Sequence, residues 1–406
     1  MSPNLAQVWQ TKLTGKLSQP VVANGKVLVA SVNVGQVFCL EAKDGTPVWT
    51  FTAGSRVDSP PTIFGGLALF GSADGWVYCL RAADGALAWR FRAAPAERHL
   101  VAMDRVESVW PVHGTVLVHN GVAYVSAGRS TFLDGGIWLS ALEPATGKLL
   151  HKTHLEGPYP DVTKDNGNSR EMQGARSEIL VTDGSAIYLR QAKFNAALEL
   201  EGPWTTQPPT KEASSVRLTS TSDLLDDAEF NRTSWHYGHW AVSQGGGNGG
   251  QLLVFNPSTT FGAQVYSKTV AQSMVYFPGQ GYVKLFATGH HLSDAEAPAK
   301  SKGKKRSQPA SATEWEVTIP IYARAMALAD KTLFVAGMPD TLDPQDPLAV
   351  LEGRRGGVLS AFSATDGKKL SEMRLDAPPV FDGVIAAGGR LFVSLTDGRL
   401  LCLGAN

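Results

Sequence analysis

The chain has 406 residues, 43% of them hydrophobic, and a formal net charge of +0. A neutral chain has no global electrostatic attraction to nucleic acid or to an anionic membrane, so we expect no nucleic-acid partner. Three cysteines are too few for a disulfide framework, and no apolar run is long enough for a transmembrane helix. The 42 glycines and 23 prolines suit an all-β protein with many turns.

Two stretches near the N-terminus repeat each other at a spacing of 40 residues. Residues 35–49 read GQVFCLEAKDGTPVW, and residues 75–89 read GWVYCLRAADGALAW. Trp9, Trp49 and Trp89 follow the same period. A fixed period near 40 with a strand-like pattern is typical of a radially repeated β fold. We therefore expect units of four short strands that stack into one body.

The strand-like units follow one another along the whole chain. In the first unit, Asn24-Gly25 and Asp44-Gly45 lie between strand-like runs, which is a good hairpin signal. The units expected are residues 18–51, 58–92, 109–155, 175–200, 235–318, 321–375 and 379–406. This division predicts seven blades, and two blades within residues 235–318 would give eight.

The two ends of the chain complement each other. The C-terminal DGRLLCLGAN matches DGWVYCLRA but stops before a Trp-bearing strand, and the N-terminal LAQVWQTKL supplies such a strand. We therefore expect the N-terminal strand to complete the last unit, which removes two free sheet edges. The sequence thus predicts an all-β fold, a single β-propeller of four-stranded blades over residues 1–406.

Some features predict structure rather than chemistry. Cys39, Cys79 and Cys402 occupy one repeat position in apolar strands and are expected to be small buried residues. Residues 292–313 are low in complexity and basic, which predicts a disordered loop inserted in a blade. The N-terminus lacks the apolar stretch of a signal peptide. The chain is then either cytoplasmic or a mature or trimmed piece of a longer protein, and further domains before Met1 stay open.

The pattern Leu-x-Ala-x-x-Gly-x-x-x-Trp, from Leu40 to Trp49 and from Leu80 to Trp89, resembles the PQQ-like repeat. That repeat occurs in quinoprotein dehydrogenases and in the outer-membrane assembly lipoprotein of the BamB type. WD40 propellers share the period, but this chain has no Trp-Asp dipeptide. Segments such as ESVWPVHG (107–114) and PPVFDG (378–383) are similar to bacterial propellers of this kind without an assigned reaction. The resemblance implies a turn that packs the Trp against the neighbouring blade, and an extracytoplasmic location.

The resemblance does not extend to the catalytic residues of quinoprotein dehydrogenases. Those enzymes have adjacent cysteines over the cofactor, and this chain has no Cys-Cys pair. Their Glu, Asn and Asp ligands for Ca²⁺ and their catalytic Asp have no match here. PQQ with Ca²⁺ stays open as a cofactor, and no metal site is predicted, because His236 and His239 lack a third ligand nearby.

Loops that join the outer strand of one blade to the inner strand of the next open on one face of a propeller, around its channel. In this sequence nearly every such loop brings a charge just before an apolar inner strand. These residues are Arg56, Asp58, Arg105, Glu107, Arg176, Glu178, Asp226, Asp227, Arg232, Arg324 and Asp382. The longest loop between second and third strands adds Arg129, Ser130 and Asp134, and Trp110 and Trp235 could stack on a flat ligand.

This set predicts a ligand-binding channel mouth, since arginine binds carboxylates in bidentate fashion. The alternative is that arginines and carboxylates pair with each other and tie the blades together. Three functions compete. The first is a binding or scaffold module for a small molecule or protein partner, and we expect a monomer. The second is a PQQ-dependent oxidoreductase. The third is a polysaccharide-binding or polysaccharide-acting propeller with Glu107 and Asp134 as paired carboxylates.

Overall fold

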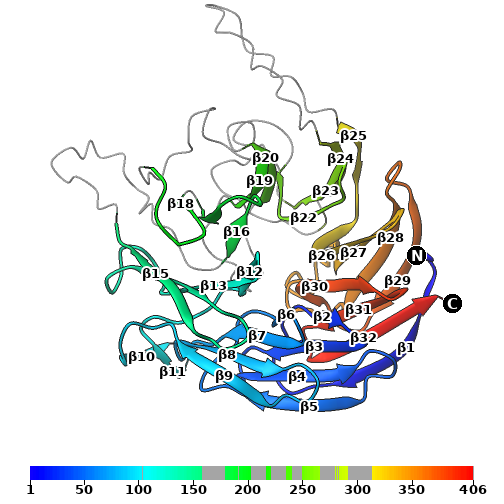
Figure 1. Cartoon of the computed structure of the whole chain (residues 1–406). Coiled ribbons are helices and arrows are strands. Elements are labelled where there is room, and N and C mark those ends of the chain that lie inside the picture. The colour runs from blue at the N-terminus through cyan, green and yellow to red at the C-terminus, as the bar shows by residue number, and fades with distance from the viewer. Residues whose placement is uncertain are drawn as a thin grey trace, which may run out of the picture. The chain divides into compact units, whose positions relative to one another are not determined.

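The computed structural model describes residues 1–102, 104–157, 179–190, 192–202, 216–220, 235–239, 249–265, 279, 281, 283–290 and 313–405. Every regular element in these ranges is a β-strand (Figure 1). They form six four-stranded sheets, two three-stranded sheets and one two-stranded hairpin. The all-β prediction is confirmed. None of the described segments is a helix that could span a membrane.

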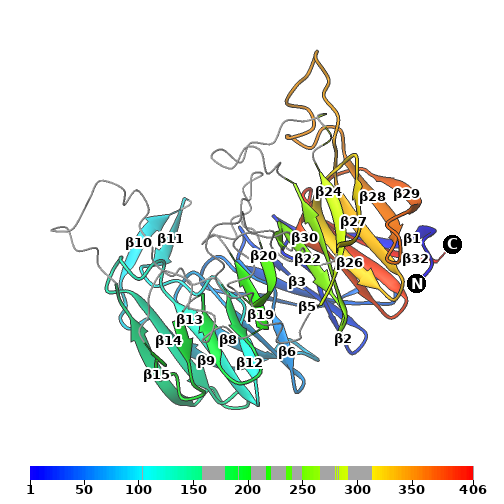
Figure 2. The same cartoon turned by 90° about the horizontal axis from the view of Figure 1, so that it is seen from above.

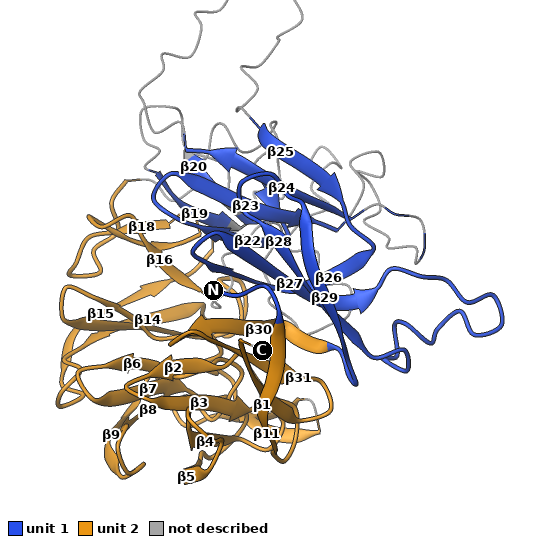
Figure 3. Cartoon of the chain, turned by 90° about the vertical axis from the view of Figure 1, so that its right-hand side faces the viewer, with its two compact units in different colours: residues 1–4, 209–222, 228–378 blue, residues 5–208, 223–227, 379–406 orange. Residues whose placement is uncertain are grey.

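The chain divides into two compact units (Figure 3). The larger unit comprises Leu5–Pro208, Asp223–Asp227 and Pro379–Asn406. The smaller unit comprises Met1–Asn4, Pro209–Ser222 and Ala228–Pro378. A single domain over the whole chain stays a prediction.

The larger unit holds five antiparallel sheets. The first is ordered β1 (Leu5–Lys12), β32 (Arg399–Ala405), β31 (Arg390–Leu395) and β30 (Pro379–Ala387). The second comprises β2 (Val21–Ala23), β3 (Lys26–Ser31), β4 (Gln36–Glu41) and β5 (Pro47–Thr52). The third comprises β6 (Thr62–Phe64), β7 (Leu67–Gly71), β8 (Trp76–Arg81) and β9 (Leu87–Arg92). The fourth comprises β12 (Leu117–His119), β13 (Val122–Ala127), β14 (Ile137–Leu142) and β15 (Leu149–Leu155). The fifth comprises β16 (Leu180–Thr182), β17 (Ile187–Leu189) and β18 (Ala192–Phe194).

The N-terminal strand completes the last sheet, as predicted. β1 pairs with β32 from Leu5 opposite Ala405 to Lys12 opposite Arg399. The unit at residues 379–406 is therefore built from the two ends of the chain. The pairing gives β32 a neighbour on both sides, so neither of its edges is exposed.

Tryptophans of the outer strands connect each sheet to the next. The indole nitrogens of Trp9, Trp49 and Trp89 donate to carbonyls of Ala42, Ala82 and Pro144 at 3.1, 3.0 and 2.9 Å. Each ring lies against the turn glycine of the following sheet, Gly45, Gly85 or Gly147, where a Cβ would come within 2.5 to 2.6 Å of the indole. The repeat therefore needs both Trp and Gly, because any side chain on the turn would displace the ring.

Buried clusters lie between successive sheets of the larger unit. The three cysteines belong to this core, as predicted, and all are free and buried. Burial raises the pKa of the Cys39 thiol to about 11 and that of Cys79 to about 12. Neither thiol is therefore ionised at neutral pH, and both act as small apolar groups.

The described residues of the smaller unit form three sheets. The first comprises β19 (Val216–Ser220), β20 (Trp235–His239) and β21 (Gly249–Gly250). The second comprises β22 (Leu252–Phe255), β23 (Thr259–Gln264), β24 (Lys284–Gly289) and β25 (Thr313–Thr318). The third comprises β26 (Ile321–Ala329), β27 (Thr332–Pro339), β28 (Gly357–Ser363) and β29 (Lys369–Leu375). Here Trp315 donates to the Ala364 carbonyl at 3.0 Å, a repeat contact that the sequence pattern did not identify.

The smaller unit differs from the expected division at residues 235–318. Residues 235–239 pair with β19, in a different sheet from β22–β25. The larger and smaller units thus hold five and three sheets of three or four strands among the described residues, which favours eight blades, and the blade count stays a prediction. Of the predicted disordered loop at 292–313, only Thr313 is among the described residues, at the start of β25.

Candidate functional site

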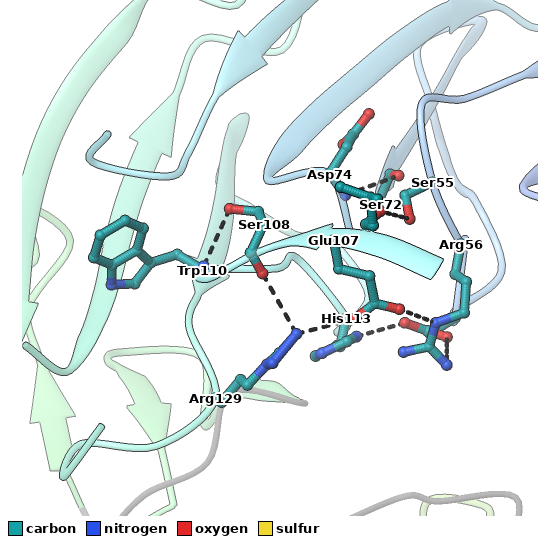
Figure 4. Close-up of polar contacts among 11 residues, drawn as sticks. Ser55, Arg56, Ser72, Asp74, Glu107, Ser108, Trp110, His113 and Arg129 are labelled. Atoms are coloured by element: carbon teal, nitrogen blue, oxygen red, sulfur yellow. Dashed lines mark hydrogen bonds and ion pairs between the residues drawn. The ribbon is translucent and has the colours of Figure 1, made fainter. Parts of the chain in front are cut away.

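Three connections from different sheets of the larger unit meet at one buried carboxylate (Figure 4). Glu107 is 1% exposed. It accepts hydrogen bonds from Arg56 Nε at 2.6 Å and from Arg129 Nη2 at 3.0 Å. Arg56 follows β5, Glu107 precedes β12, and Arg129 follows β13. The loop alignment predicts this meeting of charges, and a role in ligand binding stays a prediction.

A two-stranded hairpin explains why Glu107 is buried. Strand β10 (His99–Ala102) pairs with β11 (Arg105–Ser108), placing Leu100 opposite Glu107 and Val101 opposite Val106. Cross-strand pairs alternate between the two faces. Leu100 packs on the core and Glu107 is buried, whereas Val101 and Val106 are 78% and 63% exposed. The alternation of the hairpin therefore directs Glu107 towards the two arginines.

A second carboxylate extends the cluster. Asp58 lies 3.3 Å from Arg56 Nη1, and His113 Nδ1 lies 2.5 Å from its Oδ2. Burial pushes the pKa of Asp58 upward, but the hydrogen bond and charge of His113 and the charge of Arg56 outweigh it and hold the pKa below its usual value. We call Arg56, Asp58, Glu107, His113 and Arg129 the connection cluster. Within this cluster the charges of the two guanidinium groups balance those of the two carboxylates.

His113 is a member that the sequence reasoning missed. It lies in the WPVHG run, just after the position where the other loops carry their charge. Its side chain is 22% exposed, similar to the 18% of Asp58. Because this run resembles a segment of PQQ-like propellers, its one polar side chain could have identified His113 as a candidate.

Trp110, Ser130 and Asp134 have structural partners. Trp110 is 7% exposed within the core, and its Nε1 donates to the Asp134 carbonyl at 2.9 Å. Ser130 Oγ accepts from the Phe132 amide at 3.2 Å, and the Asp134 carboxylate lies 3.7 Å from Arg98. Trp110 thus presents no open ring face for stacking.

The remaining predicted residues are dispersed. Arg105 is exposed at the tip of the hairpin, opposite Ala102. In the smaller unit, Arg324 is 7% exposed at a register shift of β26, and Trp235 is half-buried in β20. Arg176, Glu178, Asp226, Asp227 and Arg232 lie outside the described residues.

Asp382 occupies an irregular part of the innermost strand β30. The register shifts between Pro379 and Val384, and Asp382 has a left-handed φ of 53°. Such a conformation is uncommon for a residue other than glycine. The residue is exposed, yet desolvation by the surrounding protein raises the pKa of its carboxyl to about 7. The bulge therefore presents a carboxyl that changes charge near neutral pH.

The comparisons with known proteins agree with this architecture. Residues 3–163 match the family model described as outer membrane protein assembly factor BamB. The crystal structure of BamB from Moraxella catarrhalis is similar with a TM-score of 0.53 and 12% identity, over 99% of this chain and 100% of that one. The chain has the fold of a PQQ-like repeat β-propeller. No curated protein matches it in sequence.

Two enzymes share the propeller fold. Quinohemoprotein alcohol dehydrogenase ADHIIG from Pseudomonas putida HK5 gives a TM-score of 0.55 at 12% identity, over 98% of this chain and 76% of that one. The quinohemoprotein alcohol dehydrogenase from Comamonas testosteroni gives 0.53 at 12% identity, over 100% and 77%. At this identity the likeness shows the fold alone.

The connection cluster of the propeller does not fit PQQ with Ca²⁺. Both arginines already bind Glu107, so an anionic cofactor would have to displace a buried carboxylate. Among the described residues, no three His, Cys, Asp or Glu side chains gather into a group that could hold a metal ion. The arrangement instead ties three connections together.

Proposed function

We propose that the chain is a binding and scaffold propeller that holds a protein partner on its connection face. We define the connection face as residues 53–61, hairpin β10–β11 and residues 128–136. The observation that carries the proposal is the buried Glu107, which joins Arg56 and Arg129 from two other connections. Because these ion pairs order the loops before a partner binds, little conformational entropy is lost on binding.

The exposed side of the hairpin supplies apolar anchors. Val101 and Val106 pair across the strands at 78% and 63% exposure, and Leu133 of the neighbouring loop is 48% exposed. Figure 2 shows the hairpin standing away from the sheets β6–β9 and β12–β15. Adjacent exposed apolar side chains on a rigid support favour a protein surface over a small ligand.

The other two functions have weaker support at these residues. An oxidoreductase needs free cations for PQQ, and Arg56 and Arg129 are engaged. A polysaccharide-acting site needs two accessible carboxylates, whereas Glu107 is buried between two arginines and Asp134 lies beside Arg98. The oxidoreductase remains an outcome of the titration with PQQ.

The family model supports a protein partner and a location outside the cytoplasm. Its description names an assembly factor for outer membrane proteins, and an assembly factor acts on other proteins. We extend that role to this chain only as part of the proposal.

The direct test is site-specific photocrosslinking in cells that produce the protein natively. A photoreactive residue at Val101 or at Val106 should give the same discrete adduct. A matched control at Val48 of β5, 37% exposed, should give none. Val106→Asp should abolish the adduct from position 101. Identical adducts from Val48, or none from the hairpin, would contradict a partner on this face.

The competing function is tested by calorimetric titration of the purified chain with PQQ, with and without Ca²⁺. We expect no saturable heat, because the arginines are already paired. One-to-one binding that disappears in Arg129→Ala would overturn the scaffold proposal in favour of a quinoprotein.

A further inference from the structure

Two neighbouring sheets of the larger unit carry the same pairing of an indole with a cation. In one, the Arg90 guanidinium of β9 lies over the ring of Trp76 in β8, 4.5 Å from its centroid. In the next, the Lys152 ammonium of β15 lies over the ring of Trp138 in β14, at 4.7 Å. Contacts at this distance are attractive cation–π interactions, which hold each cation in place.

The two pairs occupy equivalent positions of the repeat. Both sheets have a register shift between their last two strands, at Cys79/Leu80 and at Ala141/Leu142. Counted from that shift, Arg90 of one sheet corresponds to Lys152 of the other. Two residues further, Arg92 lies opposite Trp76, and His154 lies opposite Trp138. In the sheet β2–β5 the same positions hold Gln36, Thr50 and Thr52. The pairing is therefore a feature of two sheets and is not required by the repeat.

The basic side chains differ in their acidic neighbours, because His154 lies 3.7 Å from Glu156. Among the described residues, no carboxylate forms a salt bridge with Arg90, Arg92 or Lys152, and all three are exposed. Burial lowers the pKa of Lys152, and the positive charge of Arg92 lowers it further, so charges of the two sheets lie near each other. The structure thus keeps like charges close together, although a salt bridge or a greater separation would relieve their repulsion.

The positions of the cations suit an extended chain. β9 and β15 are the last strands of their sheets, and no described strand pairs with their outer edges. Arg90 and Arg92 are two residues apart, as are Lys152 and His154, so each pair projects to one face. A strand added along such an edge would place its own alternate side chains beside these bases.

We propose that the outer edges of β9 and β15 bind an acidic extended segment of a partner protein. Its backbone would bond to the strand edge, and its alternate carboxylates would contact Arg90 and Arg92 on β9 or Lys152 on β15. The exposed Leu87 and Leu149 at the start of the two strands would contact an apolar residue of the segment. Each indole holds one cation over its ring, and Trp138 also stacks on His154 with ring centroids 4.6 Å apart, so the rings orient the bases. This site is separate from the connection face.

The test uses a fluorescent eight-residue peptide of alternating Glu and Val, with binding to the intact chain followed by anisotropy. We expect saturable binding that weakens with salt. The double variant Arg90→Gln/Arg92→Gln should weaken it about 3- to 10-fold, the loss expected for two exposed ion pairs. The matched control Arg81→Gln, an exposed arginine of β8 paired with Asp84, should leave it unchanged. Thermal melting confirms that each variant is folded.

Further peptides separate strand addition from simple charge attraction. A peptide N-methylated at alternate amides should lose binding, because it cannot bond to the edge. Equal binding by the methylated peptide, or by one with four Glu followed by four Val, would overturn the strand geometry. Binding of heparin but not of the peptide would reassign the site to an anionic glycan. Absence of peptide binding, with self-association of the double variant, would show that the cations protect a free edge from aggregation.

Discussion

The connection cluster and the outer strands β9 and β15 use the same residue types in opposite ways. In the cluster, two arginines surround a carboxylate that is 1% exposed, and charge cancels inside the protein. On the outer strands, Arg90, Arg92 and Lys152 lie over or beside indole rings and remain exposed. An arginine near an acidic residue in the sequence is therefore as consistent with a structural ion pair as with a binding site. Unneutralised cations held by neutral rings are the better sign of a partner.

The largest expected effect comes from breaking the cluster at its centre. Glu107→Gln removes the carboxylate that Arg56 and Arg129 share, and it leaves Arg56 with Asp58 alone. Breaking such a buried charge arrangement costs about 3–5 kcal/mol. Chemical denaturation should show this loss, and hydrogen exchange should increase first in β10 and β11. The exposed Glu143→Gln is the control. A stability unchanged from that control would mean that Glu107 does not hold the face together.

His113 tests the second carboxylate of the cluster. Its interaction with Asp58 is a hydrogen bond to a charged group, so His113→Ala should cost about 1–3 kcal/mol near pH 6. The lowered pKa of Asp58 stabilises the fold above its ordinary pKa, and this contribution is lost as the pH falls through the folded-state value. The difference between wild type and variant should therefore shrink between pH 6 and pH 2.5.

The control for that series is His119→Ala, which removes a half-buried histidine of β12 whose side chain forms a hydrogen bond with the neighbouring Asn120. A difference that stays constant over the same pH range would show that His113 stabilises the fold by packing and not through the charge of Asp58.

Asp382 should show the opposite pH dependence. Its pKa is raised to about 7, so its contribution to stability is fully present below the ordinary Asp value and is lost as the pH rises through 7. Asp382→Asn should therefore raise Tm at pH 8 relative to wild type, by about 1–3 °C, and have less effect at pH 4. Asp330→Asn, with a similar φ of 57°, controls for the backbone conformation. An equal shift at both pH values would rule out a titration effect.

Much of the fold could be predicted because the repeat carries it in a few residues. The Trp and Gly spacing carries the resemblance to the PQQ-like repeat, and that resemblance implied the contacts of Trp9, Trp49 and Trp89. The split last unit predicted the pairing of β1 with β32. The expected division into units did not include β19. Its five residues, VRLTS, give a weak strand signal, and β20, with which it pairs, lies well further along the sequence. Trp315 was missed because it follows the long basic segment, which obscures the spacing.

The site was less predictable than the fold. Loop alignment brought Arg56, Glu107 and Arg129 to one face, but it could not decide which charges would neutralise each other. That choice depends on the two-residue alternation of a short hairpin, which buries Glu107 and exposes Val106. The cations on β9 and β15 were missed because their significance comes from register between strands, not from spacing along the chain.

The smallest expected effect on stability belongs to the outer strands. Arg90→Gln/Arg92→Gln removes two exposed charges and the cation–π contact of Arg90 with Trp76, so the free energy of unfolding should fall by no more than about 1 kcal/mol. Relief of repulsion with Lys152 should offset part of this loss at low salt, and added salt should abolish the offset. Denaturation at two ionic strengths measures both effects. A loss as large as that of Glu107→Gln would make these cations structural, and the contrast between the two regions would then disappear.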